Sequence, residues 1–159
     1  MIFITLGSQK FQFNRLLKEI DRLIETGVIT DEVFAQIGYS DYQPRHFAYK
    51  QFLDRDEFAE MQSKADVEIT HAGTGAIIGA VKKGKKVIAV PRLAKYGEHV
   101  DDHQLQLLEQ FDELGLICSC KDCSELEEAL KTIGERQFNS YESNTERYIF
   151  ELDRYIASI

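Results

Sequence analysis

The stretch that most constrains the fold runs from Asp66 to Gly75, where a short apolar segment leads directly into a glycine turn. Residues 66–70 read D-V-E-I-T, which is partly alternating and rich in β-branched residues, as is typical of a strand. The next five residues, H-A-G-T-G, contain Gly73 and Gly75, and a helical segment of about two turns follows before Gly84. This order predicts backbone N–H groups facing a bound ligand. Because a helix start carries partial positive charge, the preferred ligand is a phosphate or a diphosphate.

A second polar segment follows the next predicted strand. Residues 86–90, K-V-I-A-V, read as a buried parallel strand that ends at Pro91. A polar loop covers residues 92–101, and Asp102 suits the N-cap of another helix. Ligands of open α/β sheets bind at the carboxyl ends of strands, so the glycine turn and this loop should converge on one ligand.

The rest of the chain alternates between strand and helix patterns. Strands are predicted at residues 2–6, 33–37, 48–52 and 116–119, in addition to 66–70 and 86–90. Helices are predicted to begin near the capping residues Asn14, Asp54 and Ser124, and a last helix covers about 144–158. The alternation predicts an α/β fold, a Rossmann-like doubly wound parallel sheet with helices on both faces.

Length and charge narrow the possible functions. The 159 residues, 43% of them hydrophobic, suit one soluble domain spanning 1–159. The net charge of −8 argues against a nucleic-acid partner, and the lysines at 82, 83, 85 and 86 form only a local patch, better explained as a helix end. Without a membrane-spanning run or a signal peptide, we expect a cytoplasmic protein.

Two patterns are weak candidates for metal or cofactor binding. The three cysteines of C-S-C-K-D-C, at positions 118, 120 and 123, lack the fourth ligand that structural zinc normally has. Gly73, Gly75 and Gly79 resemble a dinucleotide fingerprint, but they follow the fourth strand and not the first, and the next strand ends in V-P-R without an acidic residue. We therefore expect neither a metal nor a nicotinamide cofactor.

The polar loop contains a dense set of donors and acceptors. Its candidate binding residues are Glu98, His99, Asp102, His103 and Gln104. Imidazole and carboxylate groups could hold a metal, but no recognised ligand spacing is present, and hydrogen bonding to a sugar beside a phosphate fits better. His71 either contacts the phosphate or is an ordinary strand-end histidine, and the adjacent glycines favour the first interpretation.

Three motifs together carry a family resemblance. H-A-G-T-G at 71–75, V-I-A-V-P-R at 87–92 and H-V-D-D-H-Q at 99–104 resemble the C-terminal, UDP-sugar-binding half of glycosyltransferase family 28. The Gly7-Ser8 turn, F-N-R-L-L and A-Q-I-G are similar too, and the resemblance extends from Met1 to about Leu130. It is strongest to short, single-domain members, namely the catalytic subunit of the eukaryotic dolichol-linked N-acetylglucosaminyltransferase and the small subunits of bacterial capsule and exopolysaccharide transferases. The length and the string K-K-G-K-K-V-I-A-V-P-R favour the bacterial kind.

The resemblance implies roles for individual residues. The UDP diphosphate would lie among Gly7, Ser8 and the turn at 71–75, which contributes His71, Gly73, Thr74 and Gly75. Arg92 would lie beside the uridine, and Asp102, His103 and Gln104 beside the donor sugar. Many relatives carry a ribose-binding glutamate on the helix after the glycine turn, where this chain has Gly79. Catalysis would need no metal and no cofactor other than the UDP-sugar donor.

The resemblance also implies a partner. A GT-B enzyme reacts its substrates between two Rossmann-like domains, and this chain has residues for one half. We therefore expect a second, membrane-anchored subunit that brings a lipid-linked saccharide acceptor and the catalytic base, which would place this chain at the inner face of the membrane. The reaction would be hexose transfer from a UDP-sugar in capsular or exopolysaccharide biosynthesis.

Several alternatives stay open. In the last helix, Tyr148, Leu152 and Tyr155 either anchor the partner or pack back on their own sheet. The chain could instead be a non-catalytic accessory subunit, or a stand-alone nucleotide-sugar enzyme such as an epimerase or a dehydrogenase. The isolated chain could also form a homodimer over its partner surface.

Overall fold

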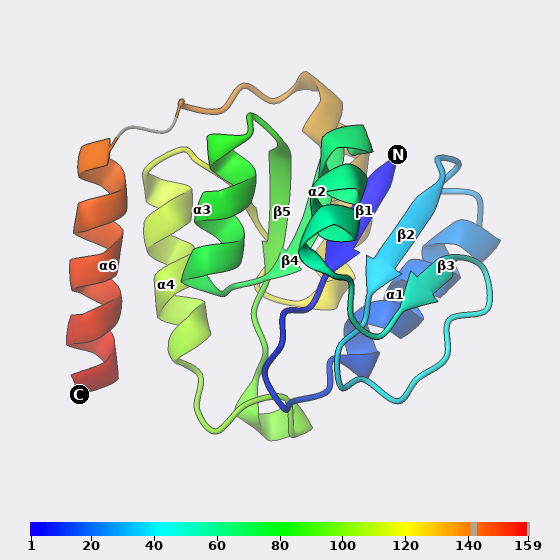
Figure 1. Ribbon diagram of the computed structural model, residues 1–159, viewed down its shortest axis with the longest axis horizontal. Coiled ribbons are helices and arrows are strands. Elements are labelled where there is room, and N and C mark those ends of the chain that lie inside the picture. The colour runs from blue at the N-terminus through cyan, green and yellow to red at the C-terminus, as the bar shows by residue number, and fades with distance from the viewer. Residues whose placement is uncertain (141–142, 159) are drawn as a thin grey trace.

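The computed structural model describes residues 1–140 and 143–158, without the side chains of residues 143–146, 148, 149, 157 and 158. Within these residues, six strands form one parallel sheet in the order β3-β2-β1-β4-β5-β6 (Figure 1). The strands are β1 (Ile2–Thr5), β2 (Val33–Gln36), β3 (Ala48–Lys50), β4 (Val67–His71), β5 (Lys86–Val90) and β6 (Cys118–Ser119). The predicted doubly wound sheet is confirmed.

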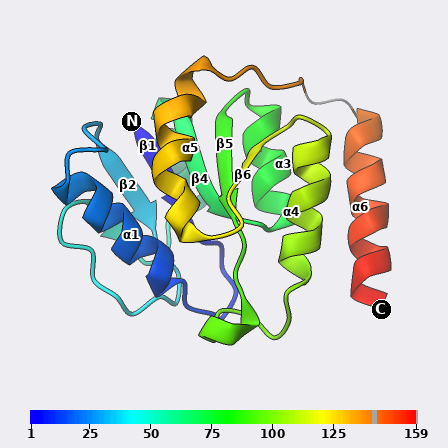
Figure 2. The same cartoon turned by 180° about the vertical axis from the view of Figure 1, so that it is seen from behind.

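Helices cover both faces of the sheet. One face carries α1 (Asn14–Glu25) and α5 (Leu126–Thr132), which lie in front in Figure 2. The other face carries α2 (Arg55–Lys64), α3 (Thr74–Lys82) and α4 (His103–Glu113). Of these, α2 and α3 lie in front in Figure 1. The last helix, α6 (Ser143–Ser158), packs on α3 and α4 and not on the sheet.

The hydrophobic core has two parts, one on each side of the sheet. On β5, Ile88 and Val90 belong to the part that packs against α1 and α5, whereas Val87 and Ala89 belong to the part that packs against α3 and α4. Successive side chains of a strand point to opposite faces, so a strand covered on both faces is apolar throughout. This is why K-V-I-A-V reads as a continuous apolar run.

The helix caps follow the predictions only in part. Asp54 forms a capping box with Glu57, as predicted, and accepts a hydrogen bond from the Glu57 N–H at 2.8 Å. The prediction for Asn14 is wrong, because this residue is already helical and its side chain accepts a hydrogen bond from the Tyr42 N–H. The Ser124 prediction is wrong as well. Asp122 is the N-cap of a 3₁₀ turn, Cys123–Glu125, that precedes α5.

The lysine run is structural. The Lys85 ammonium donates to the carbonyl oxygens of Ser63 and Ala65 at the end of α2. The Lys86 ammonium donates to the carbonyl oxygens of Ile133 and Gly134 just after α5. A cation at a helix C-terminus is favourable because the free carbonyl groups there carry partial negative charge. The ends of two other helices, α2 and α5, therefore explain this part of the run, whereas a solvated helix end was expected.

The order of the strands places a crevice between β1 and β4. From β1 the chain adds β2 and β3 on one side, then returns to add β4, β5 and β6 on the other. The direction of winding therefore reverses between β1 and β4, and ligands of such sheets bind at the carboxyl ends of the strands at this point. The turns after β1 and β4 flank the crevice. No helix in the described part of the chain is long and apolar enough to cross a membrane.

One carboxyl group is buried in the middle of the sheet. Glu68 on β4 is fully buried, and it accepts a hydrogen bond from the Gln62 amide at 2.9 Å through one oxygen. The other oxygen has no hydrogen-bond partner in the described part of the chain. Burial raises the pKa of Glu68 from 4.5 to about 7.

We expect this carboxyl group to make the fold less stable as the pH rises. Between pH 4.5 and about 7 the native protein holds a proton that the unfolded chain has released, so the free energy of unfolding falls with rising pH in this window. Glu68→Gln should remove that dependence and raise the free energy of unfolding at pH 8 by about 2 kcal/mol. Urea unfolding at pH 5 and pH 8 measures both effects.

The exposed variant Glu60→Gln on α2 is the control, and it should leave the pH dependence as in the wild type. A Glu68→Gln protein with the wild-type pH dependence would contradict this assignment.

Candidate functional site

The imidazole of His71 lies between two glycine turns at the carboxyl edge of the sheet. A Cβ atom at Gly7, after β1, would lie 2.7 Å from Nε2 of His71, and one at Gly73, after β4, would lie 2.2 Å from Cε1. Gly7 also has a φ of +73°, a backbone conformation that residues with a side chain rarely adopt. A third glycine, Gly38 after β2, faces the Gly7 carbonyl, because a Cβ there would lie 2.9 Å from that oxygen. The turns can approach each other only because these residues lack side chains.

His71 is buried and neutral. It is 7% exposed, and its Nδ1 has no hydrogen-bond partner in the described part of the chain. Burial lowers the pKa of His71 to about 3, with smaller contributions from the nearby Arg92 and His99. A neutral imidazole keeps one donor and one acceptor nitrogen, so it can serve a ligand's hydroxyl or oxygen without carrying charge.

Arg92 is a buried cation that joins two ends of strands. It is 1% exposed, and one of its terminal nitrogens, Nη2, donates to the carbonyl oxygens of Leu6 at 2.7 Å and Phe11 at 3.3 Å. Its Nε and Nη1 have no partner among the described residues. Burial lowers the pKa of Arg92 to about 10, so the side chain stays charged at neutral pH. A buried cation with unused donors is suited to an anion.

The start of α3 lies directly beside His71. Gly73 is the N-cap, no side chain caps the helix, and its first turn contains no acidic residue. Nothing lies within 4 Å of a Cβ atom at Gly75. The first N–H groups of a helix have no partner within it, so this helix start combines unmet donors, partial positive charge and open space.

The polar loop divides into a buried and an exposed part. Glu98 is fully buried, accepts hydrogen bonds from Arg15 Nε at 3.0 Å and Nη2 at 3.1 Å, and also accepts one from the Leu93 N–H. Gln104 is 5% exposed, and its amide oxygen accepts from the Arg92 N–H. Glu98 thus forms an ion pair that joins α1 to the loop, and it does not face the open space over α3.

The residues at the start of α4 form a smaller cluster. Asp101 accepts a hydrogen bond from the His103 N–H, and its carboxylate lies 3.3 Å from Nδ1 of His99 and 3.4 Å from Nδ1 of His103. Asp102 occupies the N-cap position, as predicted, but its carboxylate accepts from the Ala94 N–H at 2.8 Å and does not cap α4. Donation from the His103 N–H lowers the pKa of Asp101.

The predicted site residues therefore fall into three groups. One group, gathered around the crevice and the start of α3, is Gly7, His71, Gly73, Thr74, Gly75, Arg92 and Gln104. A second group, His99, Asp102 and His103, lines the start of α4, and Ser8 is exposed beside Gly7. Glu98 is buried in its ion pair with Arg15 and belongs to neither group. Sequence reasoning missed Gly38 as a contact of Gly7 and Arg15 as the partner of Glu98, although A-Q-I-G and F-N-R-L-L were recognised. It also missed Asp153, which lies in no motif.

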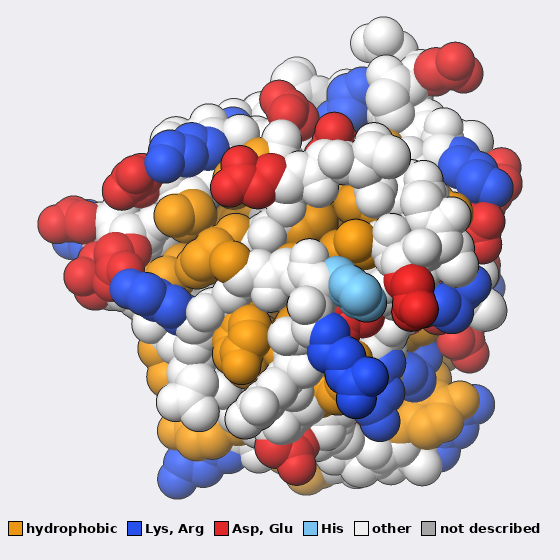
Figure 3. All heavy atoms as spheres, turned by 90° about the vertical axis from the view of Figure 1, so that its right-hand side faces the viewer, with side chains coloured by type: hydrophobic (Ala, Val, Ile, Leu, Met, Phe, Trp, Pro, Cys, Tyr) orange, Lys and Arg blue, Asp and Glu red, His pale blue; other side chains and the backbone are white. Residues whose placement is uncertain are grey.

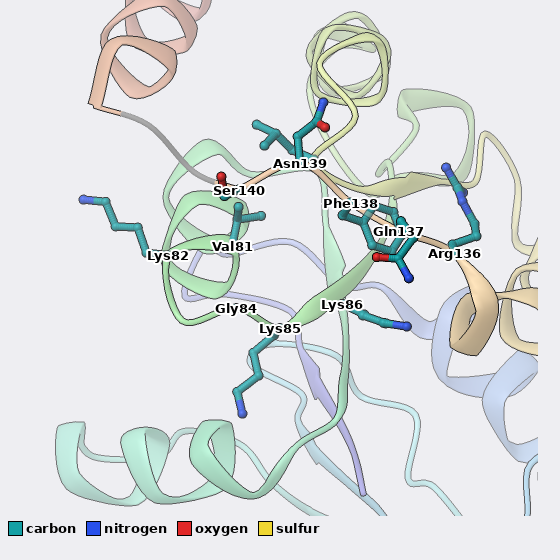
Figure 4. Close-up of a pocket in the computed structure, with 11 residues that line it drawn as sticks. Val81, Lys82, Gly84, Lys85, Lys86, Arg136, Gln137, Phe138, Asn139 and Ser140 are labelled. Carbon is teal, nitrogen blue, oxygen red and sulfur yellow. The ribbon is translucent and has the colours of Figure 1, made fainter.

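A cavity of about 510 Å³ lies at the opposite edge of the sheet, among the amino ends of β5 and β6 (Figure 4). It is lined by Lys85, Lys86, Arg136 and Phe138, among others. The lysine ammonium groups are bonded to helix-end carbonyls, and the side chains of Lys82 and Lys85 point away from each other in Figure 4. The buried nitrogens without a hydrogen-bond partner lie instead at His71 and Arg92, so the candidate site is the carboxyl edge. In the described part of the chain, no three His, Cys, Asp or Glu side chains are grouped so that they could hold a metal.

Comparison with known proteins gives the family. The sequence model of the glycosyltransferase family 28 C-terminal domain matches residues 1–155. The chain belongs to this family. It is 33% identical over 128 residues to the UDP-N-acetylglucosamine transferase subunit ALG13 of Candida glabrata, covering 75% of this chain and 59% of that protein. It is 31% identical over 98 residues to the subunit of the same name from Homo sapiens, covering 57% of this chain and 8% of that protein. The chain thus spans less than two thirds of these relatives.

Solved structures show the same fold. The glycotransferase of kitacinnamycin superposes with a TM-score of 0.59 at 16% identity, covering 99% of this chain and 39% of that one. MurG of Acinetobacter baumannii superposes with a TM-score of 0.55 at 21% identity, covering 83% of this chain and 40% of that one. This family 28 domain is therefore Rossmann-like and corresponds to one half of a GT-B glycosyltransferase.

We predict that the two glycines of the H-A-G-T-G turn differ in their tolerance of a side chain. Gly73→Ala should lower the free energy of unfolding by about 1–3 kcal/mol, because the new methyl group meets the wedged His71 ring. Gly75→Ala should be neutral or stabilising, because its Cβ meets nothing. Urea unfolding of both variants tests this, and equal stabilities would show that the ring is not wedged.

Proposed function

We propose that this chain is the donor-binding subunit of a UDP-sugar-dependent glycosyltransferase. The observation that carries the proposal is the set of buried, unpartnered nitrogens, Nδ1 of His71 and Nε and Nη1 of Arg92, beside the uncapped start of α3. These groups lie at the switch point of the sheet, where a diphosphate would find both charge and donors. Membership of family 28 and the name of the ALG13 relatives support a UDP-sugar as the ligand.

The proposed chemistry is transfer of a hexose with UDP as the leaving group. Negative charge develops on the diphosphate as the bond to the sugar breaks, and fixed N–H groups at the start of α3, together with the Arg92 cation, would stabilise it. Because these donors are held by the fold before the ligand arrives, little reorganisation is needed. The proposal includes no metal ion and no cofactor other than the donor.

The side chains near α4 are assigned to the donor sugar. His99, Asp102 and His103 line the start of α4 beside α3, and their imidazole and carboxylate groups can hydrogen-bond sugar hydroxyls. Gln104 would act through the loop, because its amide oxygen already holds the Arg92 N–H. Glu98 would hold Arg15 and the loop in place without touching the donor.

The acceptor and the catalytic base are assigned to a second polypeptide. The relatives are named as subunits, and the two solved glycosyltransferases are each more than twice as long as the part that this chain matches. We propose a membrane-anchored partner that presents a lipid-linked saccharide, which would hold this chain at the inner face of the membrane. Capsular or exopolysaccharide biosynthesis is the proposed setting.

Two surfaces are suited to this partner. On α6, Ile156 packs against the core between α3 and α4, whereas Phe150 is 44% exposed and Tyr155 is 65% exposed. Leu152 is half-buried, and the Tyr148 side chain lies outside the described residues.

The second surface lies at the other end of the sheet, beyond β3, where hydrophobic side chains gather among charged ones (Figure 3). The exposed rings of Tyr39 and Phe52, with centroids 5.3 Å apart, follow β2 and β3. Exposed aromatic residues are typical interface anchors.

A non-catalytic accessory subunit is the second candidate. The observation in its favour is Gly79 on α3, at the position where the family resemblance implies a ribose-binding glutamate. Nothing lies within 4 Å of a Cβ atom at this position, so the structure has room that this chain leaves unused. Binding of the donor separates the two functions.

We predict that the purified chain binds UDP and that Gly75→Val weakens this binding. The valine has room in the ligand-free fold but would occupy the space over the first turn of α3. Calorimetric titration with UDP should therefore show at least a tenfold weaker Kd for Gly75→Val. Gly134→Ala, just after α5 and also in open space but at the amino edge of the sheet, is the control and should bind as the wild type does.

His103→Ala should weaken the binding of a UDP-sugar more than the binding of UDP, because this residue is assigned to the sugar. If the wild-type chain does not bind UDP at millimolar concentration, either alone or with its partner subunit, the donor-binding proposal is wrong and the accessory function is favoured.

A further inference from the structure

Asp153 brings the last helix into contact with the candidate site. One of its carboxylate oxygens accepts a hydrogen bond from the Thr74 hydroxyl at 3.2 Å. The other lies 3.6 Å from Nε2 of His103. Thr74 is the first residue of α3 and His103 the first residue of α4. A single carboxylate therefore bridges the starts of both helices.

The start of α3 lacks negative charge of its own, whereas α4 begins directly after Asp101 and Asp102. Neither α3 nor α4 has an acidic residue in its first turn, and neither has a side-chain hydrogen bond from its N-cap residue. Asp101 accepts from the His103 N–H at α4, but α3 has no such neighbour in its own sequence segment. A carboxylate at an uncapped helix start is stabilised by the partial charge there, and Asp153 supplies one from a distant part of the chain.

The direction of α6 fits this contact. In Figure 1 it runs antiparallel to α3 and α4, so that its C-terminal end, which has no basic residue in its last turn, lies near their starts. Ile156 of the same end packs between α3 and α4. The packing of α6 thus holds Asp153 at the edge of the site.

An independent observation marks the same place as a ligand site. The His71 ring, 7% exposed and adjacent to Gly73, has a nitrogen without a partner, and Arg92, 1% exposed, has two. These nitrogens have no hydrogen-bond partner even with Asp153 in place, so its carboxylate satisfies only some of the donors around the site. A diphosphate, which is larger and more highly charged, could meet more of it.

We propose that the Asp153 carboxylate occupies an anion position at the start of α3 in the ligand-free protein and that the diphosphate of the donor displaces it. This inference rests on the proposed donor-binding function and adds a regulatory contact to that site. Donor binding would release Thr74 and His103 from α6, so the donor and the last helix would compete for the same two residues. Asp153 would then weaken donor binding until α6 moves.

The test is calorimetric titration of UDP and of inorganic pyrophosphate into the wild-type chain, Asp153→Asn and Glu151→Gln. Removing the competing charge should tighten the Kd for both ligands by about three- to tenfold in Asp153→Asn. Glu151→Gln removes the same charge from the same helix, but its carboxylate lies near Arg147 and is 64% exposed, so it should bind as the wild type does.

The outcomes separate the two proposals. UDP binding that is equal in the wild type and Asp153→Asn, or weaker in the variant, would overturn the inference and leave the donor-binding function standing. The weaker result would mean that Asp153 positions Thr74 and His103 for the ligand. Absence of UDP binding in all three proteins, with or without the partner subunit, would overturn both proposals. A circular dichroism melt of each variant shows whether it is folded.

Discussion

The contact on which the candidate site depends is the packing of the His71 ring between the turns that follow β1 and β4. The strand order brings these two turns together, and only glycine at positions 7 and 73 leaves room for the ring. Gly38 extends the same constraint to the turn after β2. The edge of the sheet is thus shaped by missing side chains, which leaves backbone groups and buried nitrogens to face a ligand.

A charged network holds the other side of this edge. Arg92 reaches from the end of β5 to the carbonyl oxygens of Leu6 and Phe11, while Arg15 on α1 pairs with the buried Glu98 of the polar loop. Removing one member of a buried pair leaves an uncompensated charge, so this network fixes the loops relative to each other. The site is therefore held in position before a donor binds, which is what stabilisation of a departing diphosphate requires.

The fold could be predicted from the sequence, because local periodicity predicts the strands and helices. K-V-I-A-V and the capping box at Asp54 are local signals, and both agree with the structure. The glycine turns of the site were found for the same reason. The inward orientation of Glu98 and the bridge made by Asp153 could not be predicted, because their partners Arg15, Thr74 and His103 lie 50 to 83 residues away along the chain. Contacts at that separation depend on the packing of whole helices, which a local pattern does not contain.

The geometry of the candidate site implies that a diphosphate binds over the start of α3 beside His71. Chemical-shift mapping by NMR of the backbone amides and the His71 imidazole tests it most directly, with UDP and uridine compared at equal concentration. UDP should shift the signals of residues 73–76 and of the His71 ring nitrogens, and uridine should leave them nearly unchanged. If UDP instead shifts the amides around the cavity at Lys86 and Arg136, or shifts residues 73–76 no more than uridine does, the diphosphate does not bind at the start of α3.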